Sequence, residues 1–527
     1  MHHLTGQDRS QTFSTSLEAS IGADNPVRVI DAFVDALPLL EMGFNGVLPK
    51  ATGRPSFDPA HLLKLYLYGY ANRIRSSRML EQECRRNLEI RWLLGGLSPA
   101  YHTIADFRKA HPKQLKQVFR AFVAFLKKAR LLKGRYVAID STKLRAQNSR
   151  KNNFNQKKID RQLGYIQQKT DAYLELLEEE DQKEAAGLSS SSRAEIEKGL
   201  EQLQKRKRWY EQLEEQVDLS CDGQVSTSDG DSRGLLLHHN VVEVGYNCQT
   251  AVDSQHSLLL DFEATSCNDA KALFSISLSA KQVLEKKRIT VLADKAYHNG
   301  EQLGQCRQAG IITLVAYREL RHDPIPTEAY YLEKFRYNAR KDHYTCPQGQ
   351  ILTTNGSCYE VNKPASYRKN ATPNLAKHYK TKACLSCPVK ALCTASKAGR
   401  LIVRSEHASA IEANNRRVDL RKEAYRQRQA IVEHPFGTIK RAWGYTFTLM
   451  KGLEKVNGEL ALIFTCYNLR RAMSILGVKE LLRLLSLLKT NEKWLKAALC
   501  SLTGIYLRLC KQLFIFEMKN RQLLKAG

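Results

Sequence analysis

The sequence lacks any long hydrophobic run. It contains no stretch of about 18 uninterrupted apolar residues, the length that a membrane-spanning helix requires, and even the late segment SLTGIYLRLCKQLFIF includes Arg508 and Lys511. The N-terminal residues MHHLTGQDRSQTF also lack the apolar region of a secretory signal. We therefore expect a protein that stays in the cytoplasm.

Acidic residues are scarce relative to basic ones. The 527 residues contain 82 Lys plus Arg but only 54 Asp plus Glu, a formal net charge of +28 that is spread along the chain. A long polyanion is the natural partner of such a surface, which favours nucleic acid. A ribosome-associated factor or another basic soluble protein would fit the charge alone. The length predicts roughly two to four folding units.

The chain has 13 cysteines, and five of them gather in one basic segment. Disulfides are rare in the cytoplasm, so clustered cysteines there indicate metal ligands first. The stretch CLSCPVKALC holds Cys384, Cys387 and Cys393, and a Cys-Pro pair precedes it at Cys346. These four residues favour a zinc site, with Cys358 as a spare. An iron–sulfur cluster or unligated buried thiols would also fit.

The predicted elements divide the chain into four parts. Residues 1–44 are an N-terminal extension, and residues 45–130 read as short helices, beginning with DPAHLLKLYLYGY. These helices fit a helix-turn-helix type of DNA-binding domain or an ordinary bundle packed on the rest of the protein. Residues 131–475 alternate strands with helices, and residues 476–527 form a helical C-terminal tail.

The α/β part is predicted to form a mixed sheet flanked by helices. Its expected strands are 136–139, 241–252, 257–263, 289–293 and 311–317. Two insertions interrupt it, a coiled-coil hairpin at 155–218 and the Cys-rich segment at 318–405. The hairpin is predicted because heptad spacing links two sets of residues across a Ser-rich loop: Ile159, Leu163, Ile166, Tyr173 and Leu177, then Ile196, Leu200, Leu203, Tyr210 and Val217. It indicates an architectural arm or a dimer contact.

Three carboxylates carry the functional hypothesis. Asp140 in VAIDSTK and Asp294 in VLADKAY each follow a short apolar strand, and ligand sites of α/β sheets lie beyond strand ends. Glu433 is a lone acid in the basic helical stretch AYRQRQAIVEH, which Pro435 is expected to kink. An acid at a strand end is also a common turn-former or helix cap, and Glu433 would equally fit an ion-paired surface helix.

The order of these elements resembles the bacterial DDE insertion-sequence transposases, which have a ribonuclease H-like catalytic core. RPSFDPAHLLKLYLYGY and HTIADFRKAH are similar to their N-terminal helical domain, GYNCQTAVD to the strand after the first Asp, and YRQRQAIVEHPFGTIKRAWGY to the segment with the final acid. The likeness covers residues 45–475. One departure is that four residues separate Arg428 from Glu433, where the commonest family signature has three.

The resemblance implies the site residues, the cofactor and the partners. Asp140, Asp294 and Glu433 would bind Mg²⁺ or Mn²⁺, while Tyr425, Arg428 and Lys440 would contact the DNA end. The partners would be double-stranded DNA, as the terminal inverted repeats of the element and as target DNA, and a second copy of the chain in the synaptic complex. The expected location is the bacterial nucleoid.

The chemistry of such an enzyme fits the motifs that the chain has. Phosphodiester hydrolysis followed by transesterification uses two metal ions about 4 Å apart, which three carboxylates can hold. It needs neither a G-x-S-x-G nucleophile elbow nor a glycine-rich phosphate loop, and the sequence has neither. A transposase-derived regulator that only binds DNA, and a nuclease without strand transfer, are the alternatives.

Overall fold

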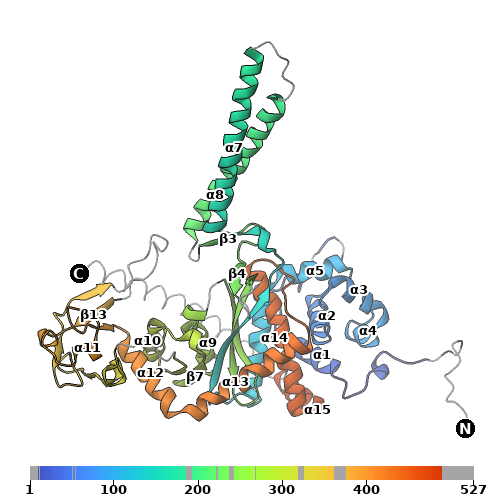
Figure 1. Cartoon of the computed structure of the whole chain (residues 1–527). Coiled ribbons are helices and arrows are strands. Elements are labelled where there is room, and N and C mark those ends of the chain that lie inside the picture. Colours follow the sequence, from blue (N-terminus) through green and yellow to red (C-terminus); the bar gives the residue numbers. More distant parts are fainter. Residues whose placement is uncertain are drawn as a thin grey trace, which may run out of the picture.

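The computed structural model describes residues 10, 12, 14–49, 51–53, 55–185, 193–220, 223–236, 242–266, 269–317, 326–360 and 375–489 (Figure 1). One hydrophobic core runs from the N-terminal helices through a central sheet to the C-terminal helices. A two-helix arm and a small module of short strands extend from this body (Figure 1). Within the described part of the chain, every helix is too short or too polar to cross a membrane.

The central sheet is mixed, as the sequence predicts, and among the described residues it has six strands, of which β4 was not predicted. Its order is β4-β5-β1-β7-β8, and β6 also pairs with β5. Strand β1 is antiparallel to β5 but parallel to β7, which is in turn parallel to β8. The strands are β1 (Val137–Arg145), β4 (Arg233–Leu236), β5 (Val242–Asp253), β6 (Leu259–Thr265), β7 (Ile289–Ala293) and β8 (Ile311–Val315).

Strand β1 is longer than predicted, because it runs to Arg145 instead of ending at Ile139. Its second half pairs with β5 along its whole length and alternates more buried with less buried residues. The apolar run marks only the part that is covered on both faces. Asp140 therefore lies inside a strand and not at its end, at the point where the pairing with β7 stops.

Helices pack against this sheet and close one of its edges. Helix α9 lies across β1, β5 and β6, while α10 and α12 pack against β8 and α13 crosses β1. Asn414 of α12 accepts the N–H of Val315 and donates to its carbonyl, so both backbone groups of this residue on β8 have hydrogen-bond partners. The helices are α9 (Leu273–Leu284), α10 (Gly300–Gln308), α12 (Ala408–Leu420), α13 (Lys422–Phe436), α14 (Leu453–Leu476) and α15 (Val478–Lys489). The predicted tail beyond residue 489 lies outside the described residues.

The N-terminal helices share their core with the rest of the protein. Helix α2 begins at an Asp58 cap followed by Pro59 and is buried on nearly all sides, because α1, α4, α5 and α14 pack against it. Helix α14 also packs against α6. Helix α1, within the predicted extension, is tied to α2 by ion pairs from Lys64 to Asp31 and Asp35. The helices are α1 (Val27–Asp35), α2 (Pro59–Ala71), α3 (Ser77–Arg86), α4 (Leu88–Leu93), α5 (Tyr101–Ala110) and α6 (Pro112–Lys128).

Two long helices form the projecting arm, in the region where the sequence predicts a coiled-coil hairpin. Helices α7 (Gln156–Ala185) and α8 (Arg193–Leu219) lie side by side (Figure 1). Their buried seam contains most of the predicted heptad residues, among them Ile159, Ile166, Leu203 and Tyr210. At the base of the arm, β2 (Asn153–Asn155) pairs with β3 (Gln224–Ser226), so the chain leaves and re-enters the body at one place.

The Cys-rich segment forms two small antiparallel sheets with a core of their own. The core residues are Phe335, Tyr344, Leu352, Tyr379 and Ile402. The first sheet contains β9 (Arg336–Asn338), β10 (His343–Thr345) and β11 (Ile351–Thr353), and the second contains β12 (Cys358–Glu360), β13 (Leu375–Tyr379) and β14 (Ile402–Ser405). A short helix, α11 (Lys390–Cys393), lies between β13 and β14 in the sequence.

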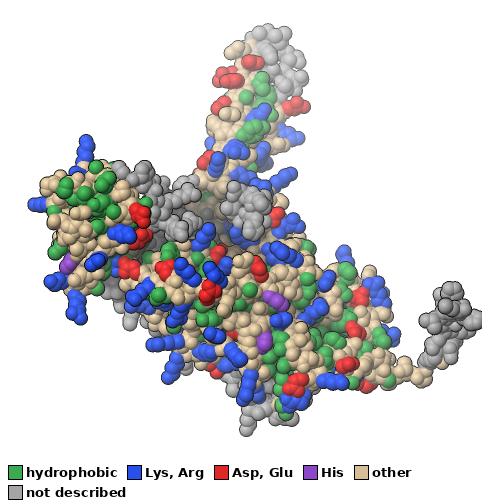
Figure 2. Space-filling model, turned by 60° about the horizontal axis from the view of Figure 1, so that its bottom comes forward, with side chains coloured by type: hydrophobic (Ala, Val, Ile, Leu, Met, Phe, Trp, Pro, Cys, Tyr) green, Lys and Arg blue, Asp and Glu red, His purple; other side chains and the backbone are tan. Residues whose placement is uncertain are grey.

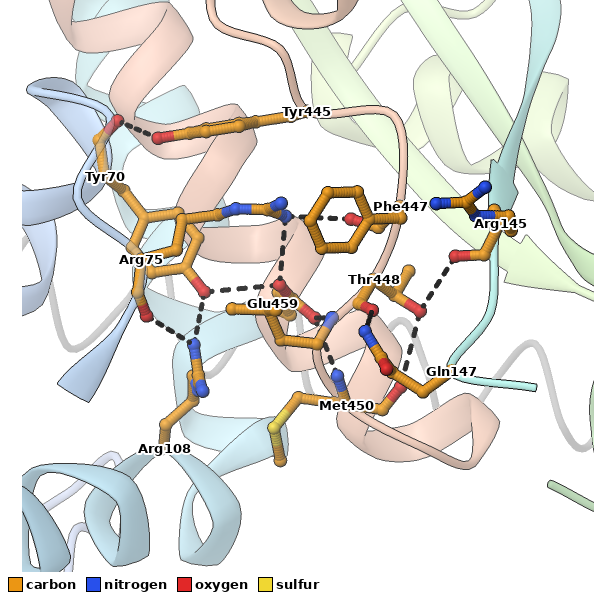
Figure 3. Close-up of polar contacts among 11 residues, drawn as sticks. Tyr70, Arg75, Arg108, Arg145, Gln147, Tyr445, Phe447, Thr448, Met450 and Glu459 are labelled. Atoms are coloured by element: carbon orange, nitrogen blue, oxygen red, sulfur yellow. Dashed lines mark hydrogen bonds and ion pairs between the residues drawn. The ribbon is translucent and has the colours of Figure 1, made fainter. Parts of the chain in front are cut away.

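A fully buried carboxylate, Glu459 of α14, joins the N-terminal helices to the central sheet (Figure 3). Its Oε1 accepts from the Tyr70 hydroxyl and from Arg75 Nη1, both at 3.4 Å, and its Oε2 accepts the N–H groups of Leu449 and Met450 at 2.8 and 3.1 Å. One side chain thus holds a helix of the N-terminal part, the loop that follows it and the segment before α14.

Arginines surround this carboxylate and extend the network to β1 (Figure 3). Arg108 donates to the Tyr70 hydroxyl at 2.7 Å, and Arg75 donates to the Phe447 carbonyl at 2.8 Å. Residues 446–448 then bond to both backbone groups of Arg145, the last residue of β1. The network therefore fixes the far end of the strand that carries Asp140.

Replacing Glu459 should destabilise the whole protein. Glu459→Gln removes the charge that compensates buried arginines, and breaking such a pair costs about 3 kcal/mol or more. The matched control is Glu454→Gln in the first turn of the same helix, where the side chain is 61% exposed, and surface changes usually stay within about 0.5 kcal/mol. Urea unfolding followed by circular dichroism measures both. Equal midpoints for the two variants would show that Glu459 is not central to stability.

Candidate active site

Asp140 lies on β1, and Asp294 directly follows the neighbouring parallel strand β7. Strand β1 pairs with β7 at Ala138 with Leu292, and the same register continued by two residues places Asp140 beside Asp294. Strand β7 ends at Ala293, whereas β1 continues with β5 as its partner. The expected convergence of the two acids follows from this shared register.

Each of the two carboxylates is held by named partners. Asp140 Oδ1 accepts the N–H of Ser141 at 2.8 Å, and Asp294 Oδ1 accepts the N–H of Ala296 at 2.8 Å. Asp294 thereby caps a 3₁₀ turn, Lys295–Tyr297, so it acts as a helix cap while it faces Asp140. Burial raises the pKa of Asp140, the charge of Arg428 opposes this shift, and the charge of Asp294 adds to it.

Helix α13 brings Tyr425 and Arg428 to the two aspartates. Arg428 Nη1 lies 3.0 Å from Asp140 Oδ2 in a largely buried ion pair. Tyr425 lies one turn earlier on the same side of the helix; burial raises its pKa, Arg428 lowers it, and the charges of Asp294 and Asp140 raise it further. The two sequence-predicted DNA contacts therefore belong to the same site as the acids.

Glu433 lies on a different side of α13. Its side chain is exposed, and its Oε1 accepts from Gln429 Nε2 at 2.7 Å. A residue five positions after Arg428 is rotated by about 140° around an α-helix, whereas the commoner four-position spacing gives about 40°. The extra residue noted in the sequence thus turns Glu433 away from Arg428. Among the described residues, no three His, Cys, Asp or Glu side chains are arranged to hold a metal ion.

Lys440 lies on a π-helix that continues α13. Helix α13 runs through Pro435 to Phe436, and residues Gly437–Ala442 continue it with the wider turn of a π-helix, so the proline does not end the helix. Lys440 Nζ donates to the carbonyl of Lys143 on β1 at 3.1 Å. Burial lowers the pKa of Lys440, and the charge of Lys143 lowers it further. The lysine thus contacts the strand of Asp140, three residues beyond it.

Sequence reasoning missed two buried polar residues under the acids. Gln249 of β5 is opposite Ser141 in the strand pairing, and Tyr297 ends the turn that Asp294 begins. The Tyr297 hydroxyl donates to Gln249 Oε1. The available signal was the pair of amides Asn247 and Gln249 at alternate positions of a buried strand, since amides are costly to bury without partners.

Comparison with known protein families gives two matches. Residues 15–110 match a model described as a transposase domain (DUF772), and residues 345–473 match a model described as a transposase DDE domain. The chain is an insertion-sequence DDE transposase. The second match contains Tyr425, Arg428, Glu433 and Lys440 of this transposase. Comparisons with curated proteins and with solved structures find no match.

The DDE match also contains the four predicted cysteine ligands of the transposase. Burial raises the pKa of the Cys393 thiol, the charge of Arg400 lowers it, and Cys384, Cys346 and Cys387 raise it. In the described part of the chain, no three of these cysteines are arranged to hold a metal ion. Cys346 Sγ accepts the N–H of Gln350 at 3.3 Å. The predicted spare, Cys358, is exposed on β12.

Proposed function

We propose that this transposase cleaves the ends of its element and joins them to target DNA by metal-dependent hydrolysis and transesterification. The observation that carries the proposal is the parallel register of β1 with β7, because continuing it by two residues brings Asp140 beside Asp294. The strand arrangement supports a ribonuclease H-like core: β1, β5 and β6 follow one another as antiparallel neighbours, and β7 and β8 add in parallel on the other side of β1.

The two aspartates fit a divalent ion, because paired carboxylate oxygens are the ligands that Mg²⁺ prefers. DDE transposases generally use divalent metals, and a bound pair would activate the attacking oxygen and stabilise the leaving one. Glu433 is proposed as the third ligand on the sequence pattern. Since it contacts Gln429 and is exposed, it would have to change its side-chain position to join the aspartates.

The cations of α13 and the π-helix are proposed to bind the DNA end. Arg428 presents a planar guanidinium that suits phosphate oxygens as well as Asp140, and Tyr425 lies beside it. Figure 2 shows Lys and Arg side chains spread over the face drawn there, as binding to a phosphate backbone requires. Double-stranded element ends, target DNA and a homodimeric synaptic complex are part of this proposal.

Asp140→Asn and Asp294→Asn should each abolish cleavage of a plasmid that carries the element ends. Losing even an indirect partner of a metal ligand costs about 10–100-fold, so losing a direct ligand should cost more than about 100-fold. Binding to the same DNA, with its salt dependence, should persist. The matched control is Asp261→Asn, a buried aspartate on β6 of the same sheet. Normal cleavage by either site variant would exclude that residue as a ligand.

The position of Glu433 favours a second candidate, a transposase-derived DNA-binding regulator without catalysis. Glu433→Gln separates the two when it is compared with Glu423→Gln, an exposed acid on the same helix. Loss of cleavage in the first variant alone supports Glu433 as a ligand. If the parent chain binds element ends but cuts them with neither Mg²⁺ nor Mn²⁺, the regulator is the correct assignment.

We further propose that Cys346, Cys384, Cys387 and Cys393 bind zinc. The four cysteines come from two separate stretches, and Cys346 and Cys393 pack on the small core of the module. The N–H group that points at Cys346 Sγ suits a thiolate ligand. A module with so small a core gains stability from bound metal.

Replacing one ligand should release zinc, whereas replacing the exposed cysteine should not. Cys387→Ser is expected to lower bound zinc from about one ion per chain to well below one half, because a structural site uses four ligands. Cys358→Ser is the control and should match the parent. Elemental analysis of the purified proteins gives the zinc content. Equal zinc in all three proteins would refute the proposed ligand set, and bound iron instead of zinc would identify an iron–sulfur cluster.

A further inference from the structure

We propose that Asp269 is a positioning residue for the catalytic pair and acts through Gln249 and Tyr297. The proposal rests on the proposed function, because it concerns how Asp294 is held relative to Asp140. A chain of buried polar contacts leads from Asp269 to the turn that begins at Asp294. Each contact in this chain has a donor and an acceptor that can be named.

The first step fixes the amide of Gln249. Asp269 Oδ1 accepts from Asn247 Nδ2 at 2.8 Å and from Gln249 Nε2 at 2.7 Å. Both amides come from alternate positions of β5, so they lie on one face of the sheet, and both are almost completely buried. Because the carboxylate takes the amide nitrogen of Gln249, the amide oxygen must point in the other direction.

The second step fixes the turn that carries Asp294. The amide oxygen of Gln249 accepts the hydroxyl of Tyr297, whose side chain is completely buried. Tyr297 closes the 3₁₀ turn: its N–H donates to the Asp294 carbonyl at 3.2 Å, and the Asp294 carboxylate caps the same turn. Anchoring the phenol therefore anchors the backbone on which Asp294 stands.

The path crosses β1 and so relates the two catalytic acids. The turn after β7 is tied to β5, and β1 with Asp140 lies between these two strands in the sheet. The 3₁₀ turn Asp269–Lys271 also packs against the turn that contains Tyr297.

Such a tie matters because metal ligands must be held within about 0.5 Å of their working positions. The backbone pairing of β1 with β7 stops at Ala138 and Leu292, two residues before the acids. Beyond that point the hydrogen bond from Tyr297 to Gln249 holds the turn with Asp294 in place relative to the sheet. Its loss should weaken metal affinity by about 10–100-fold, as for other residues that orient a ligand.

The test compares two tyrosines of equal burial. Tyr297→Phe should raise the Kd for Mn²⁺, measured on the full chain by calorimetry or by the electron paramagnetic resonance of the free ion, by about 10–100-fold. Cleavage should recover at high Mn²⁺. The control is Tyr246→Phe. Tyr246 is also completely buried, but its hydroxyl donates to Asp229, at 2.7 Å, and not to the Gln249 amide. It should keep the Mn²⁺ affinity of the parent.

A reciprocal exchange provides rescue that a general loss of stability cannot imitate. Gln249→Glu alone sets a second carboxylate against Asp269 and should weaken Mn²⁺ binding. Adding Asp269→Asn restores a complete chain of donors and acceptors, in which the carboxylate stands at position 249 and the amide at position 269. This double variant should have a Kd for Mn²⁺ within a few-fold of that of the parent. A double variant no better than Gln249→Glu would overturn the proposal, as would parental Mn²⁺ affinity in Tyr297→Phe.

Failure of the proposed function would give a different result. In that case Asp294→Asn would bind Mn²⁺ as the parent does, and the parent itself would not cut element ends. If Asp294→Asn loses Mn²⁺ while Tyr297→Phe keeps it, the metal site stands and only the positioning role of Asp269 is refuted.

Discussion

The buried carboxylate of Glu459 is the contact on which the other parts of the structure depend. A charge without water is costly, and here two buried arginines and two backbone N–H groups compensate it. The partners come from the N-terminal helices and from the segment that follows the π-helix. That segment also bonds to the backbone of Arg145, so the network holds the C-terminal end of β1. Between this end and the part of β1 that pairs with β7, Arg428 and Lys440 contact the strand.

The sequence was sufficient wherever a pattern is local. Heptad spacing predicted the arm, and acids after apolar runs predicted that Asp140 and Asp294 meet. Features that depend on tertiary register were not accessible. The extension of β1 beyond Ile139 is polar and is held by pairing with β5, the rotation of Glu433 depends on where α13 docks, and the contact of Gln249 with Tyr297 joins residues 48 positions apart.

Arg428 lies beside the two aspartates because their negative charges need compensation. Asp140 and Asp294 repel each other, and Arg428 supplies the compensating charge from a helix that is otherwise fitted to the sheet by apolar residues. Under the proposed function, the same guanidinium faces two kinds of anion, a carboxylate of the protein and a phosphate of DNA. Binding of DNA and the electrostatics of the metal ligands are then coupled through one side chain, without any change in the sheet.

The burial of α2 also has a consequence for biosynthesis. Leu67 of α2 accepts from the thiol of Cys466 in α14, a contact that spans 399 positions. Until the ribosome has synthesised α14, the apolar surface of α2 that packs against it stays exposed, and chaperones bind such surfaces. A nascent chain that stops before residue 453 lacks α14, so we expect degradation and not a stable N-terminal fragment that could compete with the full-length transposase for DNA.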